Sequence, residues 1–370
     1  MHVLVTGGAG FIGSHLVDAL IAQGHRVRVL DNLEPQVHGT QKPDYLNSKT
    51  EYLWGDVRDR EALRKALNGI EVVFHEAAMV GVGQSMYQIE RYVSANVLGT
   101  SILLDVLIND RLPIKKLIVA SSMSIYGEGQ YRCEACQAVF PPLREEKQLA
   151  ANDWEMRCPR CARHVSAQPT PEEKPLFPTS VYAVSKRDQE ELCLSVGRSY
   201  QIPTVALRYF NVYGPRQSLS NPYTGVCAIF SSRIKNQHAP LVYEDGAQTR
   251  DFVHVSDIVQ ANLLAMRELK ADYQALNVGT GIATSIGRIG ELLAELYGVA
   301  VKPELTRKFR AGDIRHCVAD VSRLSALGFK PSMKLADGLR ELVHWGKTVQ
   351  AQDHVEQAAK ELEARGLTKG

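Results

Sequence analysis

The first half of the chain alternates between short apolar runs and amphipathic segments. The apolar runs are rich in β-branched residues, as buried strands are, and they lie at residues 2–6, 25–31, 51–56, 71–78 and 115–122. The segments between them carry apolar residues at helical spacing, at residues 13–24, 59–69 and 93–110. Near-continuous apolar strands separated by amphipathic helices predict a parallel sheet covered by helices on both faces.

This rhythm breaks between residues 129 and 166. That segment holds four cysteines and several charges, and it has no sustained period. The strand and helix pattern resumes at 179–200 and 204–214, and loop-rich stretches with helices around 256–269 and 285–297 follow. We expect the last third to form a smaller lobe over the carboxyl edge of the sheet, and the charged tail from about Asp353 to be an exposed helix that frays.

Composition narrows the class of protein. A chain of 370 residues with 45% hydrophobic content can bury a large core, in two lobes. A net charge of +2 gives no basic field, so no nucleic-acid partner is expected. No apolar run approaches the roughly 20 residues of a membrane span, and MHVLVTGGAG lacks a targeting pattern. We therefore expect a cytoplasmic protein with no membrane partner, whose seven cysteines are not disulfides.

A glycine-rich loop follows the first strand. Gly7, Gly10 and Gly13 lie in TGGAGFIGSHL and open the first helix. Such glycines permit a tight turn, a close backbone approach to a pyrophosphate, and tight packing of helix on strand. The helix N-terminus adds free N–H groups and a positive partial charge for phosphates. The loop therefore predicts a dinucleotide-binding, doubly wound Rossmann sheet.

Two aspartates follow the next two strands. Asp31 lies 18 residues after Gly13, where its carboxylate suits the ribose hydroxyls of NAD and repels the extra phosphate of NADP. A solvated turn aspartate is the alternative. Asp56 follows the third strand, where it can contact the adenine or cap the next helix.

Tyr182 and Lys186 form a YxxxK pattern in SVYAVSK. On a helix, positions i and i+4 share a face, so the two side chains can meet. A free tyrosine has a pKa of about 10, and acting as a base near pH 7 requires lowering it by roughly 3, or about 4 kcal/mol. A neighbouring ammonium and a cationic nicotinamide stabilise the phenolate. The pattern alone is common among surface residues.

Several motifs occur together in one order. TGGAGFIG, Asp31, SSMSIYG, YAVSK and RYFNVYGP resemble the extended short-chain dehydrogenase/reductase family, in its nucleotide-sugar epimerase/dehydratase branch. The resemblance covers nearly the whole chain except about 129–166. It implies an α/β fold, in which a Rossmann doubly wound parallel sheet carries a smaller α/β substrate-binding lobe. The expected division is an NAD-binding domain at 1–128, 167–212 and about 250–270; an insertion at 129–166; a substrate-binding domain at about 213–249 and 271–345; and a helical tail at 346–370.

The resemblance also implies site residues. The catalytic residues are Ser122, Tyr182 and Lys186, with Ser124 close enough in sequence to be a second candidate for the serine role. The cofactor-binding residues are Gly7, Gly10, Phe11, Ile12, Gly13, Asp31, Asn32, Asp56, Val57, Ala77, Ala78, Asn96, Tyr182 and Lys186. Among these, Asn96 matches an asparagine that steadies the central helix.

Substrate residues follow from the same resemblance. The implied set is Ser122, Met123, Ser124, Asn211, Arg250, Arg310 and Asp313. Arg250 and Arg310 resemble arginines that hold nucleotide phosphates, for which forked permanent donors are apt, although surface ion pairs are the alternative. The amide of Asn211 matches a contact to the diphosphate, and Asp313 one to the ribose.

The family includes several reactions. Its dehydratases carry an acid pair where this chain has Met123 and Ser124, which cannot shuttle protons as carboxyls do. Asp31 disfavours an NADPH-dependent ketoreductase. Epimerisation at carbon 4 with tightly held NAD remains the leading interpretation. Residues 80–92, 218–230 and 309–320 look similar to dTDP-L-rhamnose 4-epimerase-like proteins. UDP-hexose epimerisation is the close competitor, and a ketoreductase, a decarboxylase and a non-catalytic NAD- or nucleic-acid-binding protein are further alternatives. A homodimer through the helices around 94–110 and 181–200 is expected by analogy.

The insertion carries two cysteine pairs. Cys133 and Cys136 are separated by 21 residues from Cys158 and Cys161, giving CxxC–x21–CxxC. Four thiolates in two knuckles suit tetrahedral zinc with no open position, and rubredoxin-type iron shares the spacing. The pattern predicts a structural zinc ribbon that orders a long connection beside the active site, as a lid or a dimer contact.

Overall fold

The protein is built around a sheet of seven parallel strands. The computed structural model describes residues 1–310 and 312–369. Across the sheet the strands follow the order β13 (Ala275–Val278), β9 (Thr204–Tyr209), β5 (Lys116–Ser122), β4 (Val72–His75), β1 (His2–Thr6), β2 (Arg26–Asp31) and β3 (Glu51–Trp54). Because β1 is flanked by β2 on one side and β4 on the other, the chain reverses direction there, which opens a ligand crevice at the carboxyl ends. The predicted doubly wound parallel sheet is confirmed.

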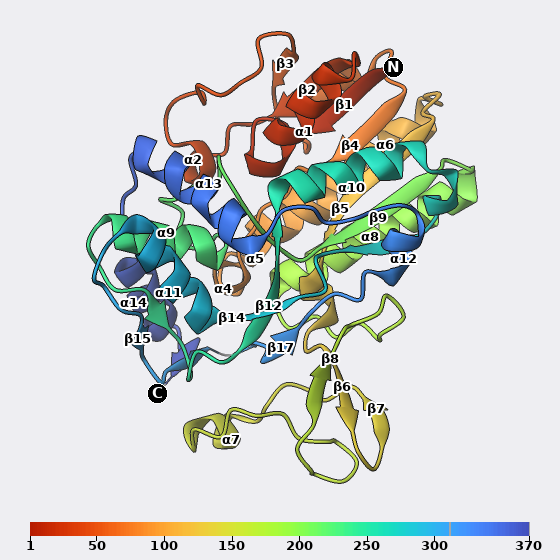
Figure 1. Ribbon diagram of the computed structural model, residues 1–370. Helices are drawn as coiled ribbons and strands as arrows, with labels where there is room; N and C mark the ends of the chain where they lie inside the picture. The colour runs from red at the N-terminus through yellow and green to blue at the C-terminus, as the bar shows by residue number, and fades with distance from the viewer. Residues whose placement is uncertain (311, 370) are drawn as a thin grey trace.

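Helices cover both faces of this sheet (Figure 1). One face carries α1 (Phe11–Ala22), α10 (Val255–Arg267) and α12 (Ser322–Ala326), and its apolar core includes Val3, Leu16 and Ile258. The other carries α3 (Arg60–Leu67), α6 (Gly99–Asn109) and α8 (Val181–Tyr200), and its core includes Leu4, Leu103 and Cys193. The side chains on the two faces of β1 thus pack into two different cores, which explains why the run HVLVT is largely apolar.

The longest apolar helical stretch runs through Ile89–Asn109. It comprises α5 (Ile89–Tyr92), the π-helical turn η1 (Val93–Leu98) and α6. By length and composition this stretch could cross a membrane, but a core helix passes the same test, and its window is 44% buried in the fold. It packs against α8 and the sheet, so we interpret it as a core helix.

A smaller lobe lies over the carboxyl edge of the sheet. Its strands are β10 (Asn211–Tyr213), β12 (Thr249–His254), β14 (Ala283–Ser285) and β17 (His316–Cys317). Three helices, α9 (Val226–Lys235), α11 (Ile286–Tyr297) and α13 (Leu335–Thr348), enclose its own apolar core. A two-stranded pair, β11 (Leu241–Val242) with β15 (Glu304–Leu305), flanks it.

One expected boundary differs from the structure. Residues from about 271 onward were assigned to the smaller lobe, yet β13 is the edge strand of the large sheet, paired with β9. Leu276 and Val278 are fully buried in the core of the large sheet. Burial of this short apolar run therefore explains why it belongs to the large sheet and not to the smaller lobe.

The C-terminal tail is packed rather than frayed, which corrects the expectation. Helix α14 (Val355–Ala364) buries Ala358 and Leu362. The strand β18 (Thr368–Lys369) then pairs antiparallel with β16 (Phe309–Arg310). Two buried apolar side chains and one strand pair therefore fix a segment whose charge pattern indicated exposure.

The insertion departs from the main body between β5 and α8. Its strands β6 (Gln130–Cys133), β7 (Gln137–Val139) and β8 (Ser166–Gln168) form a separate antiparallel sheet, and α7 (Glu146–Ala150) follows β7. Figure 1 shows this sheet projecting away from the seven-stranded sheet. A short turn, η2 (Met123–Tyr126), separates it from β5.

Candidate active site

A cavity of about 610 Å³ lies where the smaller lobe meets the carboxyl edge of the large sheet. Every residue predicted for catalysis, cofactor or substrate lines this cavity except Asn96. Residues far apart in the chain, such as Gly7, Ser122 and Arg310, therefore face one space.

The glycine loop is tightly packed on its own backbone. A Cβ at Gly13 would lie 2.3 Å from the carbonyl oxygen of Gly7, and one at Gly7, where φ is +70°, would lie 2.8 Å from the amide nitrogen of Ala77. Gly10 caps α1 with no side chain, so the first N–H groups of the helix stay open toward the cavity. This cradle fits a pyrophosphate.

Asp31 is held at the end of β2. Its carboxylate accepts hydrogen bonds from the amides of Ala9 (3.0 Å) and Leu33 (2.8 Å), and it lines the cavity. The second aspartate, Asp56, is paired with Arg58, whose hydrogen bonds hold the pKa of Asp56 at about 2. The alternative that Asp56 caps the next helix is wrong, because Asp59 caps α3.

Tyr182 and Lys186 project from the first turns of α8 into the cavity. Ser180 caps this helix by accepting a hydrogen bond from the amide of Ala183, and Lys186 donates to Oε1 of Gln189 at 2.7 Å. Burial raises the pKa of Tyr182, whereas a hydrogen bond with Ser122 acts to lower it. Burial lowers the pKa of Lys186 to about 8. Without a ligand, Tyr182 therefore keeps its proton, and it needs added positive charge nearby to ionise and act as a base.

The serine beside Tyr182 is oriented by its own turn. Ser122 Oγ accepts hydrogen bonds from the amide (3.1 Å) and the hydroxyl (2.9 Å) of Ser124. Ser122 can then donate its own proton toward the cavity. Ser124, the second candidate, instead supports Ser122, and Met123 presents a buried apolar side chain to the same cavity.

Two groups that support the site were not identified by the sequence motifs. Gln189, which accepts from Lys186, donates to Thr100 at 2.8 Å and to His75 at 3.3 Å. Burial lowers the pKa of His75 to about 3, so this network is uncharged beyond Lys186 itself. The available signal was spacing, since Gln189 lies on the helix face of Tyr182 and Lys186.

The second missed group is a carboxyl. Glu76 lines the cavity and accepts a hydrogen bond from the hydroxyl of Tyr209 at 2.7 Å, which in turn accepts from Asn262 at 2.7 Å. Burial raises the pKa of Glu76 to about 7, against the opposing effects of the Tyr209 hydrogen bond and of Lys186. A charged residue at the end of an apolar strand was the sequence signal.

Asn96 braces the site from behind. Its amide accepts from the backbone of Met79 (2.7 Å) and donates to Met79 (3.1 Å) and to the hydroxyl of Ser185 (2.9 Å). It is fully buried and does not line the cavity. This place behind the cavity lining fits the steadying role expected for Asn96, and its cofactor contact stays a prediction.

The far end of the cavity carries the predicted phosphate ligands. Arg310 donates to Asp313 at 3.0 Å and lies 4.5 Å from the ring centre of Tyr243. Arg250 donates to the backbone carbonyls of residues 314 and 315, at 2.7 and 3.0 Å. Asn211 has a buried side-chain oxygen with no partner among the described residues. The two guanidinium groups and the NH2 group of the Asn211 amide are donors for an anionic ligand, whereas the amide oxygen can only accept.

The C-terminal helix covers part of this end. Val355, Ala358, Ala359 and Leu362 of α14 line the cavity. Glu361 accepts hydrogen bonds from the hydroxyls of two tyrosines, Tyr87 at 3.0 Å and Tyr223 at 2.8 Å. The tail is therefore tied to both lobes.

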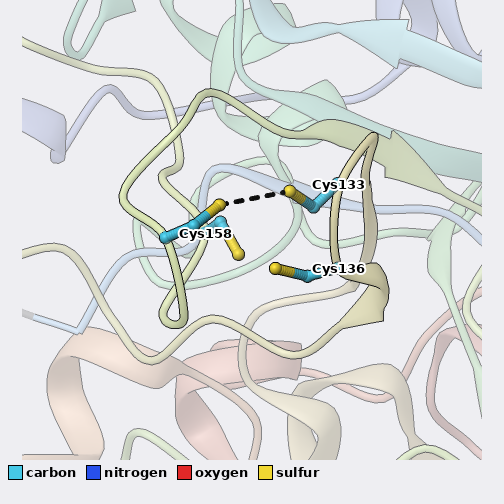
Figure 2. A group of neighbouring side chains, drawn as sticks. Cys133, Cys136 and Cys158 are labelled. Carbon is cyan, nitrogen blue, oxygen red and sulfur yellow. Dashed lines mark hydrogen bonds between the residues drawn. The ribbon is translucent and has the colours of Figure 1, made fainter.

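The four cysteines of the insertion converge. The ligand atoms of Cys133, Cys136, Cys158 and Cys161 all lie within 4.8 Å of one another. Figure 2 shows the sulfur atoms of Cys133, Cys136 and Cys158 directed into one space. Such a set can hold one tetrahedral metal ion.

Known proteins share this architecture. The NAD dependent epimerase/dehydratase family matches residues 3–145 and 161–279. The dTDP-L-rhamnose 4-epimerase of Burkholderia thailandensis is 36% identical, over 93% of this chain and 94% of its own length. A putative UDP-glucose 4-epimerase of Methanocaldococcus jannaschii is 33% identical, over 93% and 98%.

A solved structure of a related enzyme is also similar to this chain. The UDP-glucuronic acid 4-epimerase of Bacillus cereus, in complex with UDP-glucuronic acid and NAD, is 28% identical with a TM-score of 0.78, over 95% of this chain and 100% of that one. The family match spans more than half of the chain and includes the glycine cradle and the Tyr182–Lys186 pair. This chain therefore belongs to the NAD-dependent epimerase/dehydratase family, within the extended short-chain dehydrogenase/reductases.

Proposed function

We propose that the protein is an NAD-dependent 4-epimerase of a nucleotide-diphosphate sugar. The observation that carries this proposal is the shared cavity, which Ser122, Tyr182 and Lys186 line together with the glycine cradle and with Arg250 and Arg310. A sugar diphosphate anchored at the arginine end would place its pyranose ring beside Tyr182. Relatives named as 4-epimerases support the same activity.

The residues divide the chemistry between them. Tyr182 removes the proton from the 4-hydroxyl, and Ser122 hydrogen-bonds the reacting oxygen. Bound NAD supplies the hydride acceptor and returns the hydride. Lys186, held by Gln189, stabilises the phenolate while it is charged. Because the 4-keto sugar must turn over before it is reduced, the cavity has to be wide enough for rotation and closed enough to exclude water.

For the substrate, we propose dTDP-L-rhamnose and its 4-epimer, dTDP-6-deoxy-L-talose. The relative from Burkholderia thailandensis supports this choice, and a buried Met123 in the cavity suits the methyl group of a 6-deoxy sugar. A UDP-hexose is the competing substrate, since other relatives are named for UDP-sugars. A decarboxylase is also among the relatives, at 30% identity. Met123 and Ser124, which replace the acid pair, argue against dehydration.

One experiment tests both reaction and substrate. The purified protein is incubated separately with dTDP-L-rhamnose, UDP-glucose and UDP-N-acetylglucosamine, and proton NMR follows the configuration at carbon 4. We expect inversion fastest with dTDP-L-rhamnose. Inversion of a UDP-sugar alone would contradict the substrate proposal, and a lack of inversion at carbon 4 in all three sugars would contradict the proposed reaction.

We also propose that the cysteine cluster binds structural zinc. Four thiolates leave no open coordination position, and the surrounding apolar core is small, comprising Tyr131, Val139 and Met156 besides the cysteines. Rubredoxin-type iron is the alternative. Elemental analysis after dialysis should find about one zinc per chain, and a visible iron–thiolate spectrum would contradict zinc.

The oligomeric state is a further proposal. Helices η1 and α8 expose apolar side chains, among them Val93 (40%), Leu98 (49%) and Val184 (43%). We propose that two copies pair these helices in a homodimer. Light scattering should give twice the chain mass, and Leu98→Glu should give a monomer; a wild-type monomer at micromolar concentration would contradict the pairing.

A further inference from the structure

The cysteine insertion is docked on the loop that carries two of the phosphate-end residues. This loop, residues 309–316, includes Arg310 and Asp313, which line the cavity, and its backbone carbonyls hold Arg250. The segment between the two cysteine pairs contacts this loop through Arg144, Trp154 and Glu155, none of which lines the cavity. The insertion therefore touches the active site indirectly, through this loop.

An apolar contact forms the first part of the docking. Leu149 and Trp154 of the insertion form a buried cluster with Phe309, whose neighbour in the chain is Arg310. The ring centres of Trp154 and Phe309 are 6.5 Å apart. Trp154 lies four residues before Cys158, so its position depends on the order of that knuckle.

An ion network forms the second part. Arg315 is completely buried, and it donates to Glu155 of the insertion at 2.5 and 3.2 Å. It also donates to Glu244 at 3.0 Å and to Asp245 at 2.7 and 2.9 Å. A buried guanidinium that loses one carboxylate keeps its desolvation cost, so its loop must move toward other partners.

The insertion contributes a second arginine. Arg144 makes a bidentate pair with Glu244, at 2.8 Å for both bonds, and donates to the carbonyl oxygen of Asp313 at 3.4 Å. At the root of the insertion, Glu128 accepts from the amides of Arg315 and His316 and from the hydroxyl of Tyr131. The loop is thus held from both ends by residues whose position depends on the insertion.

We infer that the metal-bound insertion is a brace for the substrate-phosphate loop, and that it sets affinity for the nucleotide diphosphate without taking part in proton or hydride transfer. The inference rests on the proposed function, because it assigns the loop to substrate phosphates. Trp154 and Glu155 are positioning residues, acting through Phe309 and Arg315. A lid over the cavity is not implied, since the cavity-lining residues do not include the four cysteines.

The test compares Glu155→Gln and Trp154→Ala with Glu134→Gln, which makes the same chemical change at an exposed glutamate of the same insertion. Calorimetry measures binding of UDP and dTDP, and initial rates separate KM from kcat. We expect Glu155→Gln and Trp154→Ala to weaken nucleotide binding and raise KM by about tenfold, with kcat changed by less than about twofold. The control Glu134→Gln should match the wild type, and all three variants should retain NAD.

Metal removal gives the second readout. Protein stripped of metal by a chelator should show the same loss of nucleotide affinity, restored by zinc, while NAD stays bound. Wild-type protein that binds neither nucleotide would contradict the proposed function together with this inference. Two outcomes would contradict the brace and leave the proposed function intact. In the first, the wild type binds UDP or dTDP and both variants bind it with the same affinity. In the second, the variants lower kcat and leave KM unchanged.

Discussion

The ammonium of Lys186 lies 2.7 Å from the side-chain oxygen of Gln189, one turn further along α8. The amide nitrogen of Gln189 in turn donates to Thr100 and His75, which fixes the direction of its oxygen. Lys186 is therefore oriented by three uncharged residues, Gln189, Thr100 and His75, from two strand-and-helix units. Its orientation does not depend on a carboxylate partner.

Replacing Gln189 should affect catalysis through Lys186. In Gln189→Leu the buried ammonium loses its acceptor, so the pKa of Lys186 should fall below about 8. The lysine then loses its proton at lower pH, and the phenolate of Tyr182 loses its stabilising charge. We expect kcat at pH 7 to fall about tenfold, and the alkaline decline of the rate to begin at lower pH.

The measurement is a pH–rate profile of kcat, with Ser195→Ala on an exposed turn of the same helix as the control. An unchanged profile in Gln189→Leu would show that the lysine does not need this partner.

Glu76 should make the unliganded protein less stable as pH rises. Burial raises its folded-state pKa to about 7, above the ordinary value of 4.5. Between these values the folded state binds more protons than the unfolded state, so stability decreases from pH 4.5 to pH 7 and the penalty is complete above pH 7. Glu76→Gln should remove this penalty and raise the free energy of unfolding at pH 8 by about 2 kcal/mol. This is less than the energy of the full pKa shift, because Glu76 faces the cavity.

Urea denaturation of NAD-free protein at pH 5 and pH 8 checks this sign. A gain that is larger at pH 5 than at pH 8 would contradict the buried, protonated state of Glu76.

The tail should contribute to substrate affinity. In Glu361→Ala the hydroxyls of Tyr87 and Tyr223 lose their common acceptor, and Arg365, which lies 4.2 Å from the ring centre of Tyr87, loses its ion pair with Glu361. Undocking of α14 opens the cavity, so we expect KM for the nucleotide sugar to rise about tenfold.

Gln357→Ala, an exposed position of the same helix, provides the control for steady-state kinetics. Equal KM values in the two variants would mean that α14 packs on the cavity without closing it.

Metal removal should disorder the insertion and leave the large sheet folded. The insertion buries only a few apolar side chains around its cysteines, so it cannot stay ordered without the metal. Hydrogen exchange after chelation should show loss of protection at Tyr131 and Val139, with β1 and β5 still protected. Protection at Tyr131 that survives complete metal loss would contradict a structural metal.

Much of the fold followed from local patterns. The strands β1, β4 and β5 are largely apolar on both faces, and the glycine loop and YxxxK motif are contiguous, so each could be identified without knowing the rest of the chain. The cysteine spacing predicted a cluster that the structure brings together.

The remaining features depend on contacts between distant residues. Arg315 and Glu155 lie 160 positions apart, and nothing in the sequence pattern indicates that they pair. The tail was misjudged because its charges dominate its pattern, whereas Ala358 and Leu362 decide its packing. The steadying role of Asn96 depends on Met79 and Ser185, which no spacing rule connects to it.

The central claim is that hydride leaves and returns to the same sugar carbon beside Tyr182. The most direct measurement uses dTDP-L-rhamnose deuterated at carbon 4, with NMR of the epimer and with Tyr182→Phe as the comparison. We predict that the epimer keeps its deuterium at carbon 4, and that Tyr182→Phe lowers kcat by about 10²–10⁴-fold while NAD stays bound. Loss of the label to solvent, or full activity in Tyr182→Phe, would contradict the account.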